Sequence, residues 1–336
     1  MARDGTTDGI AAFWAWWPTA GGRIQAAIEG GGFEKDLVAE IMRHVKAIDE
    51  ELDWELGPGG EARHAFCLSS KGDPLLRKVT ERWLRAAPPR DDIWEYHPAR
   101  RGGRHADGAR LKIAGFDLML DEFALSFEID ELRELVNVTC FHPAYRDMAD
   151  DMCTTAAFLM LDDALGEDGV ERWIGGLGLE TAPPAGAKSI ADLRAAIAGL
   201  AASSTGERYA LLEGEDAEGR PFLVMANMAL KRINHLDCDH HVAVDLAVLN
   251  PTPQGMPTGA ESDDLNALED EITFLLAGAA YLGRSSGAGR RAVHFFAPGG
   301  SPARALLADW ASAHRERHAR VTWTEDPRWE ARERII

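Results

Sequence analysis

The stretch "ERYALLEGEDAEGRPFLVMANMAL", residues 207–230, decides the fold class of the second half of the chain. Two segments rich in aliphatic residues flank an acidic, glycine-containing sequence from Asp216 to Gly219. This pattern predicts two strands joined by a turn. Because strands joined by so short a turn pair antiparallel, we expect an antiparallel sheet here.

The sequence beyond this hairpin extends the same sheet. "HHVAVDLAVLN" (240–250) predicts a third strand, and "AYLGRSSGAGRRAVHFFAP" (280–298) predicts a second hairpin, bent at its glycines. Between them, Thr258 and Glu261 have the spacing of a capping box at the start of a helix. Strands that pair through hairpins, with helices laid on one face, predict the α+β class and not a doubly wound sheet.

The chain is predicted to contain two modules. "TAPPAGAKS" (181–189) has two prolines and no large apolar residue, which is typical of a linker. We therefore predict an N-terminal α+β module at 1–184, a linker and helix at 185–202, and a C-terminal α+β module at 203–336. The first module is expected to begin with short helical stretches, and each module to carry an antiparallel or mixed sheet with helices on one face.

Composition restricts the classes of function. The 336 residues carry a formal net charge of −19, so we expect no nucleic-acid binding, which needs clustered Lys and Arg. We also expect no binding to an anionic membrane surface. The N-terminus lacks a secretory pattern, and none of the four cysteines forms a C-x-x-C pair. These features predict a cytoplasmic, acidic protein with reduced thiols.

The second module resembles a bacterial family of unknown function, number 695 in its series. The resemblance covers about residues 205–331 and is carried by "GRPFLVMANMALK", "GMPTGAESDDLNALEDEI", "YLGRSSGAGRRAVHFF" and "EDPRWE" in that order. The first module, with "FWAWW", "WEYHPAR" and "LDDALGED", resembles a region often found in front of that domain. The family has no assigned activity. Some relatives are linked with a small acidic regulator that inhibits a ribonuclease, so the resemblance implies a protein partner.

The cluster "HLDCDHH" has the residue types of a metal site. Its candidate ligands are His235, Asp237, Asp239 and His240. Zinc takes three or four such ligands at about 2.0 to 2.3 Å. On a strand, however, His240 and His241 point to opposite faces, so only a turn before them could gather ligands. A polar turn that leads into a strand explains the same residues, and the alternation favours this interpretation.

Two further motifs each allow two interpretations. "LDDALGED" offers Asp162, Asp163, Glu167 and Asp168 to a divalent cation, or it is a helix end in which Gly166 stops the helix. "GRSSGAGRR" offers Arg284, Arg290 and Arg291 to a phosphate, or it is a hairpin turn flanked by arginines. In both cases the structural interpretation is favoured.

The only basic loop of this acidic chain is "ARRGGRHADGAR". Its arginines are Arg100, Arg101, Arg104 and Arg110. They are expected to contact an acidic partner or to pair with the acidic surface of the chain itself, and a solvated loop is favoured.

The segment "FWAWWP" contains Phe13, Trp14, Trp16 and Trp17. Aromatic residues of this kind anchor protein interfaces, and they also fill hydrophobic cores. The sequence leaves two interpretations open: an interaction surface, or an arm that packs on its own module.

No catalytic signature with a nucleophile and a base is present. We therefore expect a non-enzymatic binding or regulatory protein that acts through contacts with another protein and needs no cofactor. The alternative is a metal-dependent hydrolase that uses the His/Asp cluster at 235–241, with a bound divalent metal. The sequence does not define the oligomeric state.

Overall fold

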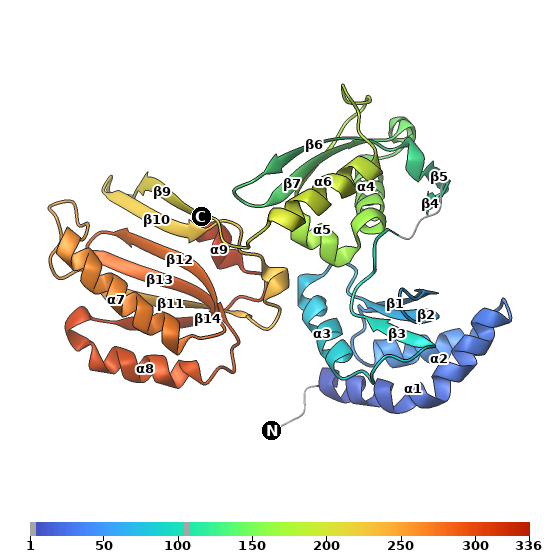
Figure 1. Cartoon of the computed structure of the whole chain (residues 1–336), viewed down its shortest axis with the longest axis horizontal. Coiled ribbons are helices and arrows are strands. Elements are labelled where there is room, and N and C mark those ends of the chain that lie inside the picture. Colours follow the sequence, from blue (N-terminus) through green and yellow to red (C-terminus); the bar gives the residue numbers. More distant parts are fainter. Residues whose placement is uncertain (1–4, 104–107) are drawn as a thin grey trace. The chain divides into compact units, whose positions relative to one another are not determined.

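The computed structural model describes residues 5–103 and 108–336, and it confirms the α+β class. The chain forms two compact units (Figure 1). The first comprises residues up to Glu128 together with Val136–Ala198, and the second comprises Ile129–Leu135 and Gly199–Ile336. Helix α6 (Ile190–Ser203) lies in the segment predicted as a linker and helix, and the division between the two units falls within it, after Ala198.

The first unit combines helices with small sheets. Its helices are α1 (Gly5–Glu29), α2 (Lys35–Lys46), α3 (Pro74–Arg85), α4 (Asp150–Leu165), α5 (Glu167–Trp173) and the start of α6. Its strands are β1 (Asp53–Pro58), β2 (His64–Ser69), β3 (Trp94–His97), β4 (Arg110–Ile113), β5 (Phe116–Met119), β6 (Ala124–Asp130), β7 (Leu135–Phe141) and β8 (Ile174–Leu179). They form the sheets β1-β2-β3, β4-β5 and β6-β7-β8, in which β2 and β3, and also β7 and β8, are parallel.

Helix α1 is the largest departure from the sequence prediction. The first module was expected to begin with short helical stretches, and a proline usually ends or kinks a helix. Instead, α1 continues through Pro18 for 25 residues. Phe13 and Trp17 lie on its buried side and pack against Phe66 of β2 before the proline, and Ile24, which follows the proline, is fully buried in the same core. Tertiary packing therefore overrides the local preference.

The second unit is built on one antiparallel sheet with the strand order β14-β11-β13-β12-β10-β9. The strands are β9 (Tyr209–Glu215), β10 (Pro221–Asn227), β11 (His240–Ala247), β12 (Ala280–Gly287), β13 (Arg290–Ala297) and β14 (Arg320–Glu325). The helices are α7 (Gly259–Leu275), α8 (Ala303–Ala313) and α9 (Glu330–Ile335). Short 3-10 turns complete both units at Leu120–Glu122, Pro143–Asp147, Arg232–Asn234 and Arg315–Arg317.

The two faces of this sheet have different covers. Val242, Val244 and Leu246 of β11 alternate with more exposed residues and pack under α7 and α8, as the sequence pattern predicts (Figure 1). The opposite face is covered in part by α9. Trp329, which precedes α9, stacks on Phe296 with ring centroids 4.0 Å apart. The end of the chain is therefore a helix packed on this face of the sheet.

Glu261 has a different role from the predicted one. Thr258 precedes α7, but its side chain makes no capping hydrogen bond. Glu261 is almost fully buried, accepts hydrogen bonds from the backbone of Leu249 and the amide of Asn250, and pairs with Arg317. The capping-box prediction was wrong because this carboxylate ties α7 to the loop after β11 and not to its own N-terminus.

Candidate functional site

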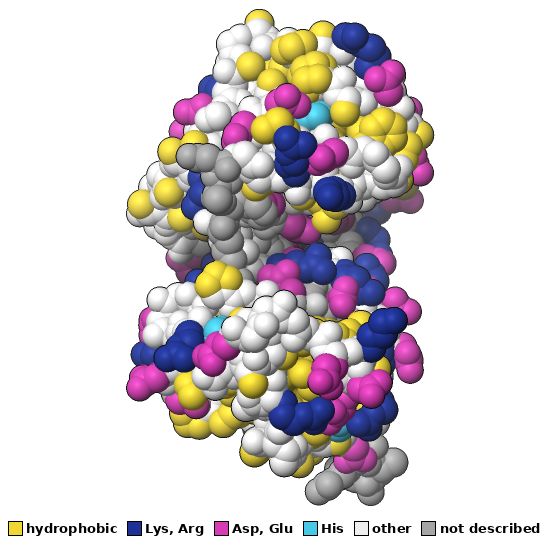
Figure 2. Space-filling view, turned by 90° about the vertical axis from the view of Figure 1, so that its right-hand side faces the viewer, with side chains coloured by type: hydrophobic (Ala, Val, Ile, Leu, Met, Phe, Trp, Pro, Cys, Tyr) yellow, Lys and Arg dark blue, Asp and Glu magenta, His cyan; other side chains and the backbone are white. Residues whose placement is uncertain are grey.

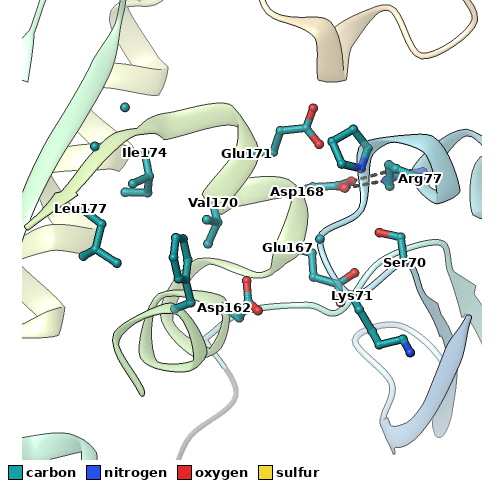
Figure 3. Close-up of a pocket in the computed structure, with 15 residues that line it drawn as sticks. Ser70, Lys71, Arg77, Asp162, Glu167, Asp168, Val170, Glu171, Ile174 and Leu177 are labelled. Atoms are coloured by element: carbon teal, nitrogen blue, oxygen red, sulfur yellow. Dashed lines mark hydrogen bonds and ion pairs between the residues drawn. The ribbon is translucent and has the colours of Figure 1, made fainter. Parts of the chain in front are cut away.

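A cavity of about 580 Å³ lies in the first unit, in the range of small-molecule sites. Its walls come from the end of β2, the start of α3, the junction of α4 and α5, and β8. The residues that line it are Ser70, Lys71, Gly72, Pro74, Arg77, Phe158, Asp162, Glu167, Asp168, Val170, Glu171, Ile174, Gly175, Gly176 and Leu177. Figure 3 shows Ile174 and Leu177 on one side of Asp162 and the ionisable groups of Lys71 and Arg77 on the other.

The junction of α4 and α5 carries most of the acidic groups and depends on Gly166. This residue has φ 76°, a conformation that favours glycine. A Cβ there would lie only 2.5 Å from the carbonyl oxygen of Arg100. The close approach allows the amide of Glu167 to donate to that carbonyl at 3.1 Å. Gly166 thus ends α4, as predicted, and also sets Asp162 and Glu167 at the cavity.

Arg77 fixes the other side of the cavity. It is 5% exposed and binds Asp168 through two hydrogen bonds, Nε to Oδ1 at 2.6 Å and Nη2 to Oδ2 at 2.8 Å. Its Nη1 donates to Glu81 at 3.1 Å. Burial by itself would lower the pKa of Arg77, but these two carboxylates outweigh it and hold the pKa above its usual value. Arg77 and Asp168 are therefore a satisfied pair that connects α3 to α5.

Asp162 is a half-buried carboxylate of the cavity. Among the residues that the structure describes, nothing donates a hydrogen bond to its carboxylate. The pKa of Asp162 is raised to about 6, chiefly by burial. The negative charge of Glu167 also raises this pKa, and its effect is larger than the opposite effect of the positive charge of Arg100. A carboxyl group with this pKa exchanges its proton near neutral pH, which is a property of many functional sites.

Glu167 lies beside Asp162 in a different environment. Its side chain is buried and accepts a hydrogen bond from the hydroxyl of Ser69, and Arg100 Nε lies 3.8 Å from its carboxylate. Burial raises the pKa of Glu167, while the hydrogen bond from Ser69 and the charge of Arg100 oppose the increase. The negative charge of Glu167 thus disfavours ionisation of Asp162, and a cation close to both carboxyl groups would favour their ionised forms.

The predicted metal cluster is not gathered into a site. His240 Nδ1 lies 2.9 Å from Asp239, whose carboxylate also accepts a hydrogen bond from the amide of Gly299. His235 instead stacks near Trp329. The amide of Asp239 donates to the carbonyl of Asp237, which is turn geometry. Within residues 5–103 and 108–336, no three His, Cys, Asp or Glu side chains are placed so that they could hold a metal ion.

The neighbouring histidine His241 points to the opposite sheet face, as the alternation predicts. Its Nε2 lies 3.2 Å from Nδ1 of His294, whose Nε2 lies 3.1 Å from the hydroxyl of Ser285. Burial lowers the pKa of both histidines, that of His294 to about 4. These side chains form a neutral polar row that the sequence analysis did not identify, because its members come from three strands.

The basic motifs are split by the fold. Arg290 pairs with Asp245 at 2.5 Å, whereas its strand neighbour Arg291 points to the other sheet face, so the three arginines of the hairpin do not form one phosphate cradle. In the basic loop, Arg101 pairs with Glu95. Arg100 approaches Asp53, Glu55 and Glu167, and Arg110 pairs with Asp117. Arg104 lies outside the described residues. The three described arginines of this loop thus pair with the chain's own acidic groups.

The aromatic segment packs into its own unit. Phe13 and Trp17 are almost fully buried, and Trp14 and Trp16 are half-buried at the edge of the same core. Trp14 donates to the carbonyl of Trp83, and Trp16 donates to Glu40. Of the two interpretations that the sequence left open, the structure favours packing within the module over an interaction surface.

Comparison with known proteins assigns a family to the second unit only. Residues 215–332 match the model of a family of unknown function (DUF695), which confirms the resemblance seen in the sequence. No curated protein and no solved structure matches the chain. The cavity of the first unit lies outside the matched residues. Its function therefore has to be argued from its own chemistry.

Proposed function

We propose that this chain is a non-enzymatic binding protein and that the cavity of the first unit holds its ligand, a small organic amine with an apolar body. The observation that carries the proposal is the Asp162 carboxylate, which lines the cavity and has no hydrogen-bond donor among the described residues. The carboxylate is half-buried, so it is partly shielded from water. A ligand that donates to it would make a charge-assisted hydrogen bond in these surroundings.

The charge of the cavity favours a cation. Four carboxylates line it, from Asp162, Glu167, Asp168 and Glu171, against two cations, Lys71 and Arg77. Arg77 is already bound to Asp168 and Glu81. An ammonium group next to Asp162 and Glu167 would favour the ionised form of both and would make charge-assisted hydrogen bonds.

The rest of the cavity favours an apolar body on the ligand. Phe158, Val170, Ile174 and Leu177 contribute aromatic and aliphatic surface. Phe158 is 44% exposed, so part of its ring is accessible to a ligand in the cavity. An aliphatic chain of several carbons attached to the amine would cover this surface.

Binding without chemical conversion fits the residues that line the cavity. The ionisable groups among them are carboxylates, Lys71 and Arg77, and in this proposal the carboxylates pair with the ammonium group of the ligand. The alternative of a metal-dependent hydrolase at residues 235–241 lacks the converging ligands that such a reaction needs.

Other partner classes have less support. Positive and negative side chains alternate on the face of the molecule drawn in Figure 2, without the single-sign patch that a nucleic acid requires. Among the described residues, every helix is too short or too polar to cross a bilayer. A protein partner stays a prediction of the sequence, and the aromatic segment expected to bind it is part of a core.

The test uses three ligands with the same six-carbon chain: hexylamine, hexan-1-ol and hexanoate. Binding to the full chain is measured by calorimetry at pH 7.5. We expect hexylamine to bind, and Asp162→Asn to lower its affinity about tenfold, equivalent to about 1.4 kcal/mol, while the same substitution leaves any binding of hexan-1-ol and hexanoate unchanged. The matched control is Asp163→Asn, which changes the adjacent carboxylate that does not line the cavity, and it should bind hexylamine like the wild type.

Two results would contradict the proposal. One is equal affinity of hexylamine for the wild type and Asp162→Asn. The other is consumption of the amine, detected as a new species by proton NMR after prolonged incubation, because a binding protein returns its ligand unchanged.

A further inference from the structure

A second pocket, of about 400 Å³, lies in the second unit on the sheet face that packs under α7. Its apolar wall consists of Leu211, Leu223, Met225, Met256 and Pro257, and its polar wall consists of Ser262, Arg284, Ser286 and Arg291. The register explains this grouping, because Met225 pairs with Arg284, Leu223 with Ser286, and Ser286 with Arg291. Paired residues of neighbouring strands share a face of the sheet.

Arg291 is the unusual member of this pocket. It is only 5% exposed, and its hydrogen bonds go to neutral groups: Nη1 to Asn266 at 2.9 Å and Nε to the hydroxyl of Ser286 at 3.2 Å. In the part of the chain that the structure describes, no carboxylate forms an ion pair with Arg291, and its Nη2 has no acceptor. Arginine remains charged in proteins. The fold therefore buries a positive charge without an opposite charge.

The neighbouring charges do not remove this imbalance. Arg284 pairs with Glu269 at 3.1 Å, and Glu269 also accepts a hydrogen bond from Tyr281. The two arginines and one glutamate give a local charge of +1, in a chain whose net charge is −19. A buried charge that lacks its partner is costly, so a ligand that supplies one negative charge would be bound favourably.

We propose that this pocket binds a small monocarboxylate with an aliphatic or aromatic body. The carboxylate accepts hydrogen bonds from Nη2 of Arg291, and the body packs on Leu223, Met225 and Met256. A local charge of +1 matches a monoanion, and the methionines offer an adaptable apolar surface. This site is separate from the cavity of the first unit and does not depend on the amine proposed there.

The experiment uses the full chain with ¹³C-labelled methionine methyl groups, because Met225 and Met256 line the pocket. Hexanoate and phenylacetate are titrated, with hexan-1-ol, hexylamine and inorganic phosphate as comparisons. We expect both carboxylates to shift the signals of Met225 and Met256, and hexan-1-ol to bind at least tenfold more weakly than hexanoate. Asp162→Asn should not alter hexanoate binding, which separates this site from the proposed amine site.

Variants test the role of the charge. Arg291→Gln should weaken hexanoate binding at least tenfold, whereas Arg290→Gln, which changes the adjacent arginine on the opposite face, should leave it unchanged. Since Arg291→Gln can disturb a buried position, Met256→Glu is the second variant. It places a carboxylate at the rim of the pocket, so it should also abolish hexanoate binding.

Three results would overturn the proposal. The first is that neither carboxylate shifts the methyl signals of Met225 and Met256. The second is that hexanoate binds Met256→Glu, or a folded Arg291→Gln, as well as it binds the wild type. The third is that hexan-1-ol or inorganic phosphate binds as tightly as hexanoate, because the pocket would then not recognise a monocarboxylate.

Discussion

Replacement of Asp162 by asparagine is expected to stabilise the first unit, and to do so only at neutral and alkaline pH. In the folded protein the pKa of Asp162 is raised from its usual 3.8 to about 6, chiefly by burial. A raised pKa means that ionising this carboxyl group costs more in the folded state than in the unfolded state. The difference corresponds to about 3 kcal/mol at about 1.4 kcal/mol per pH unit.

The sign follows from the two protonation states. Below pH 3.8 the carboxyl group is neutral in both states and contributes no pH-dependent difference. Between pH 3.8 and about 6 the unfolded state loses its proton first, so the folded state becomes progressively less stable. Above about pH 6 the full cost is present. Asp162→Asn cannot ionise, so its gain should be about 1 to 3 kcal/mol at pH 8 and close to zero at pH 4.

The assay is urea unfolding of the wild type, Asp162→Asn and the control Asp163→Asn at pH 4 and pH 8. Hydrogen exchange read by mass spectrometry over α4 distinguishes the first unit from the second. The reasoning would be refuted if Asp162→Asn were destabilised at pH 8, or if its stability relative to the wild type were the same at both pH values. If Asp162→Asn is more stable at pH 8, the wild type is less stable by the same amount because it keeps an ionised carboxylate in this cavity. Functional sites often lower stability in this way.

Three further perturbations test other parts of the account. Arg77→Met should destabilise the first unit by about 1 to 3 kcal/mol, because it removes the two hydrogen bonds to Asp168, whose carboxylate is 37% exposed, and urea unfolding measures this loss. His294 has a pKa lowered by burial to about 4, so the unfolded state binds its proton first as the pH falls below 6.5. The second unit should lose up to about 3 kcal/mol of its free energy of unfolding as the pH falls from 6.5 to 4. His294→Gln should reduce this pH dependence, measured by thermal melts. If the pH dependence is the same in His294→Gln as in the wild type, it does not arise from His294. Trp329→Ala should cost about 3 to 5 kcal/mol because it exposes Phe296, and a loss below 1 kcal/mol would show that α9 does not hold the sheet.

The second unit could be predicted well from the sequence because its information is local. The alternation after His240 and the turn at Asp216 to Gly219 act within a few residues, and both appear in the structure. The failures came where distant contacts outweigh local preference. Pro18 lies inside α1 because the buried side of the helix packs into the core both before and after it, through Trp17 and Ile24. Glu261 bonds Arg317 from another element, and no spacing within α7 indicates this pair.

The two proposed sites were only partly predictable. The residues of "LDDALGED" were recognised as acidic candidates, but no sequence pattern shows that Arg77 neutralises Asp168 while Asp162 has no donor. Arg291 was recognised within a glycine- and arginine-rich hairpin. Its separation from Arg290 follows from the alternation of faces along a strand, as it does for His240 and His241. Whether Arg291 has a carboxylate partner depends on which residue of α7 lies opposite it. That residue is Asn266, and only the tertiary structure shows this.

The most direct test of the binding account is the titration of the Asp162 carboxyl group itself. Its ¹³C signal, identified by its loss in Asp162→Asn, is followed from pH 3 to pH 8 without and with hexylamine. The account predicts a midpoint near pH 6 for the free protein and a lower midpoint with the amine present, because a bound cation favours the ionised form. A midpoint near 3.8 that the amine does not move would contradict it.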